Sequence, residues 1–206
     1  MDLPEITPKV AGLLLAGGKS SRMGVDKANL VYPPRTLPQW RHGFQLLADC
    51  CDDVYLSVRS NQNLKGWEQG LGTLIADNGE SEGPLSGMCA AASRNTLPLL
   101  VVACDLPLLD GAILRTLLAA RDGSDCVAYR SSTDGLPEPL CALYEPAFFP
   151  IWEQALGSGQ RCPRKLLMQN ASRVRLLDLE RPDALDNANS PEDFARLTQQ
   201  PVIPIP

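Results

Sequence analysis

The stretch VAGLLLAGGKSSRMGVDK, residues 10–27, changes character near its centre. Residues 10–16 are almost continuously apolar, and two glycines then open a polar and basic segment. A short apolar run that ends in glycines is typical of a strand buried in a parallel sheet. We therefore expect the chain to turn after Ala16 at the carboxyl edge of a sheet, where sheets of this kind bind ligands.

Strand-like and helix-like segments alternate along the rest of the chain. The sequence predicts helices over residues 37–51, 84–94, 110–120, 146–156, 163–170 and from 190 onward, and strands over 53–59, 73–76, 97–104, 125–130, 139–144 and 173–179. Such alternation predicts an α/β fold, a Rossmann-like three-layer sandwich whose mostly parallel sheet has helices on both faces. We expect one domain over residues 1–200, followed by a proline-rich tail at 201–206.

Composition and charge narrow the class of protein. Of the 206 residues, 44% are hydrophobic and 21% are charged, as in ordinary soluble globular proteins. The net charge of -5 argues against a general nucleic-acid binder but not against a site for a small anion. The apolar run at residues 10–16 is too short to span a bilayer and lacks the pattern of a signal peptide. We expect a cytoplasmic protein with no membrane partner.

The pattern of the seven cysteines and the single histidine argues against several kinds of site. The cysteine count is odd and no pair has C-x-x-C spacing, so we expect mostly buried, reduced thiols. His42 lies far from any cysteine cluster, which argues against a zinc site. A hydrolase triad is also disfavoured, because its usual general base is scarce here.

The segment after the first strand has the composition of an anion site. Gly17 and Gly18 allow a ligand to approach the main chain, and successive N–H groups in such a loop can surround an anion. Arg22 and Lys27 add positive charge suited to a polyphosphate. The segment matches neither G-x-x-x-x-G-K-[ST] nor G-x-G-x-x-G. The alternative is a plain tight turn with solvated basic residues.

Two aspartates follow other predicted strands. Asp105 ends the apolar run 97–104 and precedes a proline turn, which places its carboxylate for Mg²⁺, an ion that prefers one or two carboxylates plus phosphate oxygens. A capping aspartate is the alternative. Asp77 could face the nucleoside or assist the metal, although Asp-Asn-Gly at residues 77–79 is also strong turn chemistry.

Two further segments carry weaker signals. Gly83, followed by Pro84, predicts a helix N-terminus near the site, which would attract an anion or a base carbonyl. Arg161, Arg164 and Lys165 form a basic cluster that could hold a second anionic substrate. A solvated helix face is the alternative for this cluster.

Together these pieces resemble a known family. Residues 15–27 read LAGGKSSRMGVDK, which is similar to the L-A-G-G-x-S-x-R-M-G-x-D-K signature of the molybdenum cofactor guanylyltransferases. The resemblance extends over roughly residues 10–197. Its further matches, in order, are Asp77, residues 83–87, residues 104–107, Pro139 and residues 187–192.

The resemblance implies transfer of GMP from GTP to molybdenum-bearing molybdopterin, with release of pyrophosphate and with Mg²⁺ as cofactor. By this resemblance the catalytic residues would be Arg22, Lys27 and Asp105, with Asp105 as the metal ligand. The GTP side would comprise Leu15, Ala16, Gly17, Gly18, Lys27, Ser57, Asp77 and Gly83, and the pterin side Arg161, Asn187 and Asn189. Molybdenum-insertion proteins or molybdoenzyme chaperones would be transient partners.

The chain also departs from the family pattern. Residues 32–38 lack the usual glycine-containing turn, Ser57 stands near the position of the guanine-side asparagine, and residues 137–140 differ from the commonest relatives. These departures concern the choice of base more than the reaction. The alternatives are therefore CTP as donor, a sugar phosphate as acceptor, or a non-catalytic nucleotide-binding module.

Overall fold

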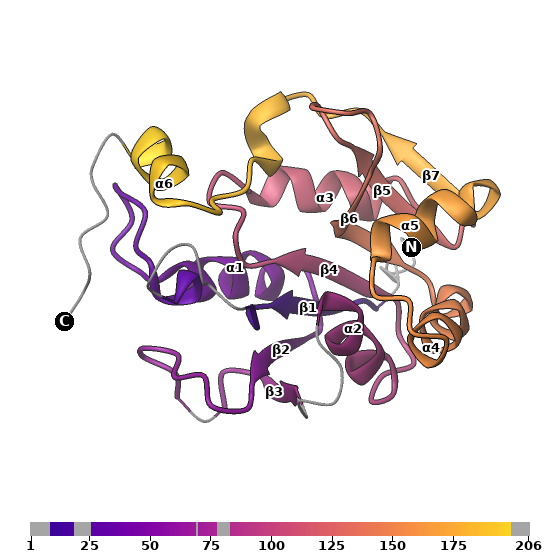
Figure 1. Cartoon of the computed structure of the whole chain (residues 1–206), viewed down its shortest axis with the longest axis horizontal. Coiled ribbons are helices and arrows are strands. Elements are labelled where there is room, and N and C mark those ends of the chain that lie inside the picture. Colours follow the sequence, from indigo (N-terminus) through magenta and orange to yellow (C-terminus); the bar gives the residue numbers. More distant parts are fainter. Residues whose placement is uncertain (1–8, 19–25, 69, 78–82, 199–206) are drawn as a thin grey trace, which may run out of the picture.

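The computed structural model describes residues 9–18, 26–68, 70–77 and 83–198, which form a seven-stranded sheet with helices on both faces (Figure 1). The strands are β1 (Ala11–Leu15), β2 (Asp53–Arg59), β3 (Thr73–Asp77), β4 (Leu99–Ala103), β5 (Cys126–Arg130), β6 (Pro137–Tyr144) and β7 (Val174–Leu177). Their order in the sheet is β3-β2-β1-β4-β6-β5-β7. The predicted α/β sandwich with a mostly parallel sheet is confirmed.

Strand β1 lies inside the sheet, with parallel β2 on one side and parallel β4 on the other. All five of its residues are buried, as its continuous apolar sequence requires. Side chains alternate between the two faces of the sheet, so Leu14 enters one core while Leu13 and Leu15 enter the other. This strand therefore joins both hydrophobic cores to the loop that follows it.

The helices divide between the two faces. They are α1 (Gln39–Ala48), α2 (Pro84–Ala92), α3 (Gly111–Ala119), α4 (Phe149–Gly157), α5 (Pro163–Gln169) and α6 (Pro191–Thr198). Helices α1 and α3 pack on the face that includes Leu14, whereas α2, α4 and α5 pack on the face that includes Leu13. Helix α6 packs separately, because Phe194 contacts Tyr32 in a small third cluster.

One predicted helix is divided in the structure, and the sheet departs from simple strand–helix alternation between β5 and β6. The predicted helix at 146–156 is a 3-10 turn, Pro146–Phe148, followed by α4, because Pro150 in the first turn of α4 has no N–H to continue the earlier turn. Strands β5 and β6, between which no helix was predicted, are joined by a short turn in which Ser131 N–H donates to Leu136 O. A short turn can connect only antiparallel neighbours, so β6 is antiparallel to β5 and to β4.

The cysteine prediction is partly wrong. Cys104, Cys126 and Cys141 are buried, but Cys162 is exposed at the start of α5. The predicted tail at 201–206 lies outside the described residues. Within the described part of the chain, no helix is both long enough and apolar enough to cross a membrane.

Helix α2 approaches β2 unusually closely at Gly87. A Cβ atom placed on Gly87 would lie 2.4 Å from Ser57 Oγ and 3.0 Å from Leu15 Cδ2. Glycine thus lets α2 pack directly over the carboxyl ends of β1 and β2. By contrast, a Cβ on Gly157 in α4 would meet no atom within 4 Å.

We expect Gly87→Ala to lower the free energy of unfolding by about 1–2 kcal/mol, because overpacking outweighs the gain in helix propensity. The matched Gly157→Ala variant should gain up to about 1 kcal/mol. Urea unfolding measures both. The cost of Gly87→Ala should shrink in a Ser57→Gly background, and equal costs in the two backgrounds would contradict the proposed contact.

Candidate active site

Strands β1 and β4 end level at one edge of the sheet, and β2 beside them continues to Arg59. Leu15 lies in register with Ser57 of β2 and with Ala103 of β4. The strand order reverses here, since β2 and β3 continue on one side of β1 and β4 lies on the other. A crevice at such a reversal is the usual ligand site of an open α/β sheet.

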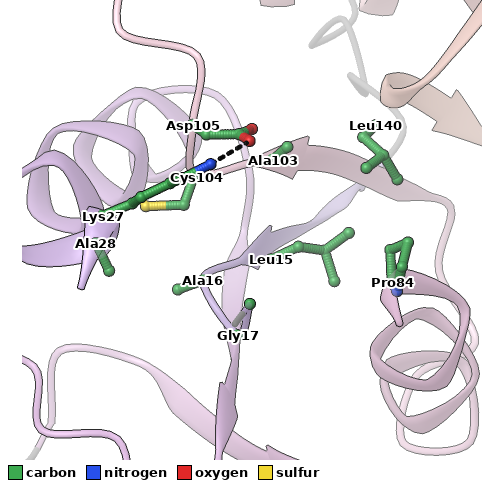
Figure 2. Close-up of a pocket in the computed structure, with 11 residues that line it drawn as sticks. Leu15, Ala16, Gly17, Lys27, Ala28, Pro84, Ala103, Cys104, Asp105 and Leu140 are labelled. Carbon is green, nitrogen blue, oxygen red and sulfur yellow. Dashed lines mark ion pairs between the residues drawn. The ribbon is translucent and has the colours of Figure 1, made fainter. Parts of the chain in front are cut away.

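A cavity of about 170 Å³ occupies this edge. It is lined by Leu15, Ala16, Gly17, Gly18, Lys27, Ala28, Pro84, Ala103, Cys104, Asp105 and Leu140. Figure 2 shows Lys27 reaching towards Asp105 beside the end of β1, with Pro84 and Leu140 on the opposite side. The structure thus brings together five predicted nucleotide residues around the predicted metal ligand.

The glycine turn is held by a single carbonyl group of β2. The N–H groups of Ala16 and Gly17 both donate to Ser57 O at 2.9 Å. A Cβ on Gly17 would lie 3.3 Å from Arg59 N, so this position suits glycine. Because these two N–H groups are already used, the predicted anion-binding concavity would have to be formed by later N–H groups of the segment, and residues 19–25 lie outside the described residues.

Ser57 has a different place from the one expected. Its side chain is buried beneath Gly87, and it lines neither this cavity nor the neighbouring one. Its backbone carbonyl, instead of its side chain, contributes to the site by fixing the turn. Base reading by the Ser57 hydroxyl therefore has no support in the geometry.

Lys27 and Asp105 form the charged centre of the site. Lys27 Nζ donates to Asn189 Oδ1 at 2.5 Å and lies 3.8 Å from Asp105 Oδ2. Their side chains are 20% and 29% exposed, so the pair is only partly screened by water. Asn189 thereby fixes the Lys27 ammonium group at the wall of this cavity.

Burial shifts the pKa of Asp105 more than the positive charge of Lys27 does. Desolvation raises the pKa of Asp105, and the positive charge of Lys27 only partly opposes this effect. Protein surrounds most of the carboxylate, although part of its side chain reaches the cavity. The ionised form is therefore incompletely compensated, which favours an additional cation nearby.

A polar network that the sequence did not reveal holds Lys27 in place. Asp26 caps the 3-10 turn Lys27–Asn29 through Ala28 N–H and also accepts from Arg59 Nη2 at 3.1 Å. Gln62 Nε2 donates to both Asp26 Oδ1 and Ala16 O. Gln62 thus ties the turn that bears Lys27 to the end of β1. No motif or spacing singled out this glutamine.

The C-terminal part of the chain supplies Asn189. The predicted start of α6 is confirmed, because Ser190 Oγ accepts from Asp193 N–H while Asp193 Oδ2 accepts from the N–H groups of Asn189 and Ser190. Ala188 N–H donates to Asp105 O at 3.0 Å. These bonds attach the segment to the end of β4, next to the Lys27–Asp105 pair.

A second cavity of about 300 Å³ adjoins the first. It is lined by Ala103, Asp105, Leu106, Glu138, Pro139, Leu140, Cys141, Cys162, Pro163, Arg164, Leu185, Asn187 and Asn189. Ala103, Asp105 and Leu140 line both cavities. Asp105 is therefore the one carboxylate shared between them among the described residues.

Other predicted residues lie at the margin or elsewhere. Gly83 caps α2 with φ of 109°, a conformation that favours glycine, at the rim beside Pro84. Arg161 donates to Leu156 O and Gln160 O and lines neither cavity, whereas Arg164 lines the second. Arg22 lies outside the described residues.

The strand order separates the backbone of Asp77 from that of Asp105. Asp77 ends β3, which is three strands from β4 in the sheet. At the usual spacing this corresponds to about 14 Å. The predicted help of Asp77 to the metal is therefore not supported, while its place at the same edge of the sheet leaves a nucleotide contact as a prediction.

The donor set at Asp105 fits a metal shared with a substrate. Among the described residues there is no group of three acidic, cysteine or histidine side chains that could enclose an ion. Mg²⁺ is commonly held by one or two carboxylates, phosphate oxygens and water, so a single desolvated carboxylate suffices. The only histidine, His42, lines neither cavity and contacts Leu109 O.

Comparison with known proteins agrees with this geometry. Residues 12–174 match the MobA-like NTP transferase domain. The chain is 32% identical over 190 residues to a molybdenum cofactor guanylyltransferase of Pseudomonas aeruginosa, covering 91% of this chain and 94% of that protein. It is 36% identical over 195 residues to a molybdenum cofactor biosynthesis bifunctional protein of Synechocystis sp., covering 90% of this chain. The chain spans about half, 53%, of that relative.

A solved structure shares the fold. Molybdopterin-guanine dinucleotide biosynthesis protein A from Archaeoglobus fulgidus superposes with a TM-score of 0.73 at 20% identity, covering 92% of this chain and 97% of that one. The match to the domain covers the glycine turn, the Lys27–Asp105 pair and both cavity-lining strand ends. The chain belongs to the family of MobA-like NTP transferase domains.

Proposed function

We propose that this protein is a molybdenum cofactor guanylyltransferase, which transfers GMP from GTP to molybdenum-bearing molybdopterin and releases pyrophosphate. The observation that carries the proposal is the Lys27–Asp105 pair at the junction of two adjoining cavities. A transferase must bring two substrates to one reacting centre, and two cavities that share a carboxylate suit that task. The relatives named guanylyltransferase support the choice of substrates.

The two substrates are assigned to the cavities by their linings. The first cavity borders the glycine turn and the N-terminus of α2, so we place GTP there. The second borders Asn187, Asn189 and Arg164, so we place the acceptor there. Their reacting groups would then meet beside Lys27 and Asp105.

The reaction needs charge stabilisation more than it needs a base. An acceptor phosphate oxygen attacks the α-phosphorus in line, a new P–O bond forms, and the bond to the leaving pyrophosphate breaks. The acceptor phosphate is already ionised at neutral pH, so the remote position of His42 is no obstacle. Lys27 would neutralise developing charge, and Asn189 would orient its ammonium group.

Mg²⁺ completes this proposal. Asp105 would hold the ion together with substrate phosphate oxygens, and the ion would polarise the reacting phosphates and neutralise their charge. The incompletely compensated Asp105 carboxylate supports this placement. Arg22 would add a further positive charge to the phosphates. Transient contact with molybdenum-insertion proteins or molybdoenzyme chaperones stays a prediction.

We expect Asp105→Asn to reduce guanylyl transfer at least about 100-fold, because the metal-binding charge is lost while the side-chain shape is kept. Pyrophosphate release with GTP, molybdenum-bearing molybdopterin and Mg²⁺ measures the rate. Asp110→Asn is the matched control, since asparagine also caps a helix and Asp110 caps α3 outside both cavities. Near-normal transfer by Asp105→Asn would remove the central claim.

The same substitution should make the ligand-free protein more stable at neutral pH. Because burial raises the pKa of Asp105 in the folded state, folding favours its neutral form. Its contribution to stability is complete below the unfolded pKa, about 4, and is lost as the pH rises through the raised folded pKa. The advantage of Asp105→Asn in urea unfolding should therefore grow over that interval and then level off. An advantage that shrinks with rising pH would contradict the assignment.

We expect GTP with Mg²⁺ to raise the melting temperature more than CTP, ATP or UTP at equal concentration, because binding to the folded state stabilises it by mass action. Stronger stabilisation by CTP would favour a cytidylyl transferase instead. Transfer to a sugar phosphate but not to molybdopterin would show that the proposed acceptor is wrong. Binding of GTP without turnover on any acceptor would leave a non-catalytic nucleotide-binding module.

A further inference from the structure

A charged pair in the second cavity takes no part in the transfer chemistry proposed above. Glu138 Oε2 accepts from Arg164 Nη2 at 2.9 Å, and Arg164 Nη1 donates to Asp134 Oδ2 at 2.9 Å. Glu138 and Arg164 line the cavity, whereas Asp134 does not. Arg164 is thus held by two carboxylates, and only one of them faces the cavity.

The cavity lining shows where Glu138 lies. Residues 137–140 of β6 alternate between buried and half-buried, with Glu138 and Leu140 half-buried, whereas residues 141–144 are all buried. Glu138 and Leu140 both line the second cavity and only Leu140 also lines the first, so Glu138 belongs to the wall on the acceptor side. Helix α5 packs over this wall and brings Arg164 against the carboxylate.

The lining of the second cavity combines apolar and polar side chains. Its aliphatic and proline side chains are those of Ala103, Leu106, Pro139, Leu140, Pro163 and Leu185, and its charged and amide side chains are those of Asp105, Glu138, Arg164, Asn187 and Asn189. Apolar surfaces beside well-placed polar groups suit a flat ring that hydrogen-bonds at its edge. Glu138 is 23% exposed at its side chain, so such an edge can reach it.

A carboxylate is complementary to a ring edge that carries two hydrogen-bond donors. A carboxylate has two oxygens that accept hydrogen bonds and no donor, so Glu138 can accept further hydrogen bonds while Arg164 occupies part of Oε2. A ring with an amino group beside a ring N–H presents two parallel donors to such an acceptor. The 2-amino-4-oxo ring of a pterin has this edge, and so does guanine.

We propose that Glu138, oriented by Arg164, is the acceptor-specificity residue that reads the amino and ring N–H edge of the pterin. This inference rests on the proposed placement of the acceptor. Glu138 lines the second cavity and not the first, which favours the pterin over the guanine of GTP. Arg164 is the positioning residue, because it holds the carboxylate towards the ring.

The test changes the hydrogen-bonding pattern of the ligand and, separately, that of residue 138. Pterin-6-carboxylate has the two-donor edge, whereas lumazine-6-carboxylate has an oxygen acceptor in place of the amino group. Glu138→Gln replaces one acceptor by an amide donor and keeps the side-chain shape and a contact to Arg164. We expect the wild-type protein to prefer the pterin and Glu138→Gln to prefer the lumazine, with a change of about tenfold or more in the ratio of dissociation constants.

Ligand-observed NMR on the full chain measures both constants without molybdopterin. Asp134→Asn is the matched control, because it removes the same charge from Arg164 outside the cavity and should leave the ratio unchanged. A ratio that is equal in wild type and Glu138→Gln, or failure of the wild type to bind either ring, would overturn the inference. Guanylyl transfer by the Asp105 site would still stand in both cases.

A second experiment determines whether Glu138 contacts the pterin or the guanine of GTP. Xanthosine triphosphate differs from GTP by the same replacement of an amino group by oxygen. Thermal shifts with the two triphosphates should keep the same order in wild type and Glu138→Gln. A reversed order in the variant would assign Glu138 to the nucleotide and overturn its assignment to the acceptor.

Discussion

The level pairing of β1 with β2 and β4 is the constraint on which the rest of the site depends. Leu15, Ser57 and Ala103 lie in one row, so the chain leaves β1 and β4 at the same height. The same row places the Ser57 carbonyl where it can hold the glycine turn. A shift of two residues in either pairing would separate Lys27 from Asp105 although every side chain would stay on its own face of the sheet.

Two kinds of support converge on the charged pair. Hydrogen bonds from Gln62 and Asp26 fix the turn on the β1 side, and the Ser190–Asp193 capping box fixes Asn189 on the β4 side. These hydrogen bonds orient Lys27 and Asp105, and the positive charge of Lys27 only partly offsets the desolvation of the Asp105 carboxylate. Such an arrangement costs stability in the free protein and gives the substrates a preorganised field. Much of the site's precision thus comes from residues that need not touch either substrate.

The sequence predicted the sheet well because apolar periodicity and turn residues are local signals. Lys27 and Asp105 could be singled out because each belongs to a short polar segment that follows a predicted strand, whereas Asn189 was assigned only through the family resemblance. The sequence did not reveal Gln62 or the role of the Ser57 carbonyl, since hydrogen bonds to backbone atoms leave no trace in residue type. The sequence placed Arg161 and Arg164 in one basic cluster and the family resemblance assigned Arg161 to the pterin side, whereas it is Arg164 that lines the second cavity.

Asn189 comes from near the end of the chain, yet its partner Lys27 comes from near the beginning. During synthesis, β1 and β4 can pair and the glycine turn can close long before residues 187–193 have left the ribosome. A nascent or C-terminally clipped chain would therefore have a nucleotide pocket with a loosely oriented lysine and an incomplete second cavity. Catalytic competence therefore depends on a contact between residues that are synthesised far apart in time, Lys27 and Asn189.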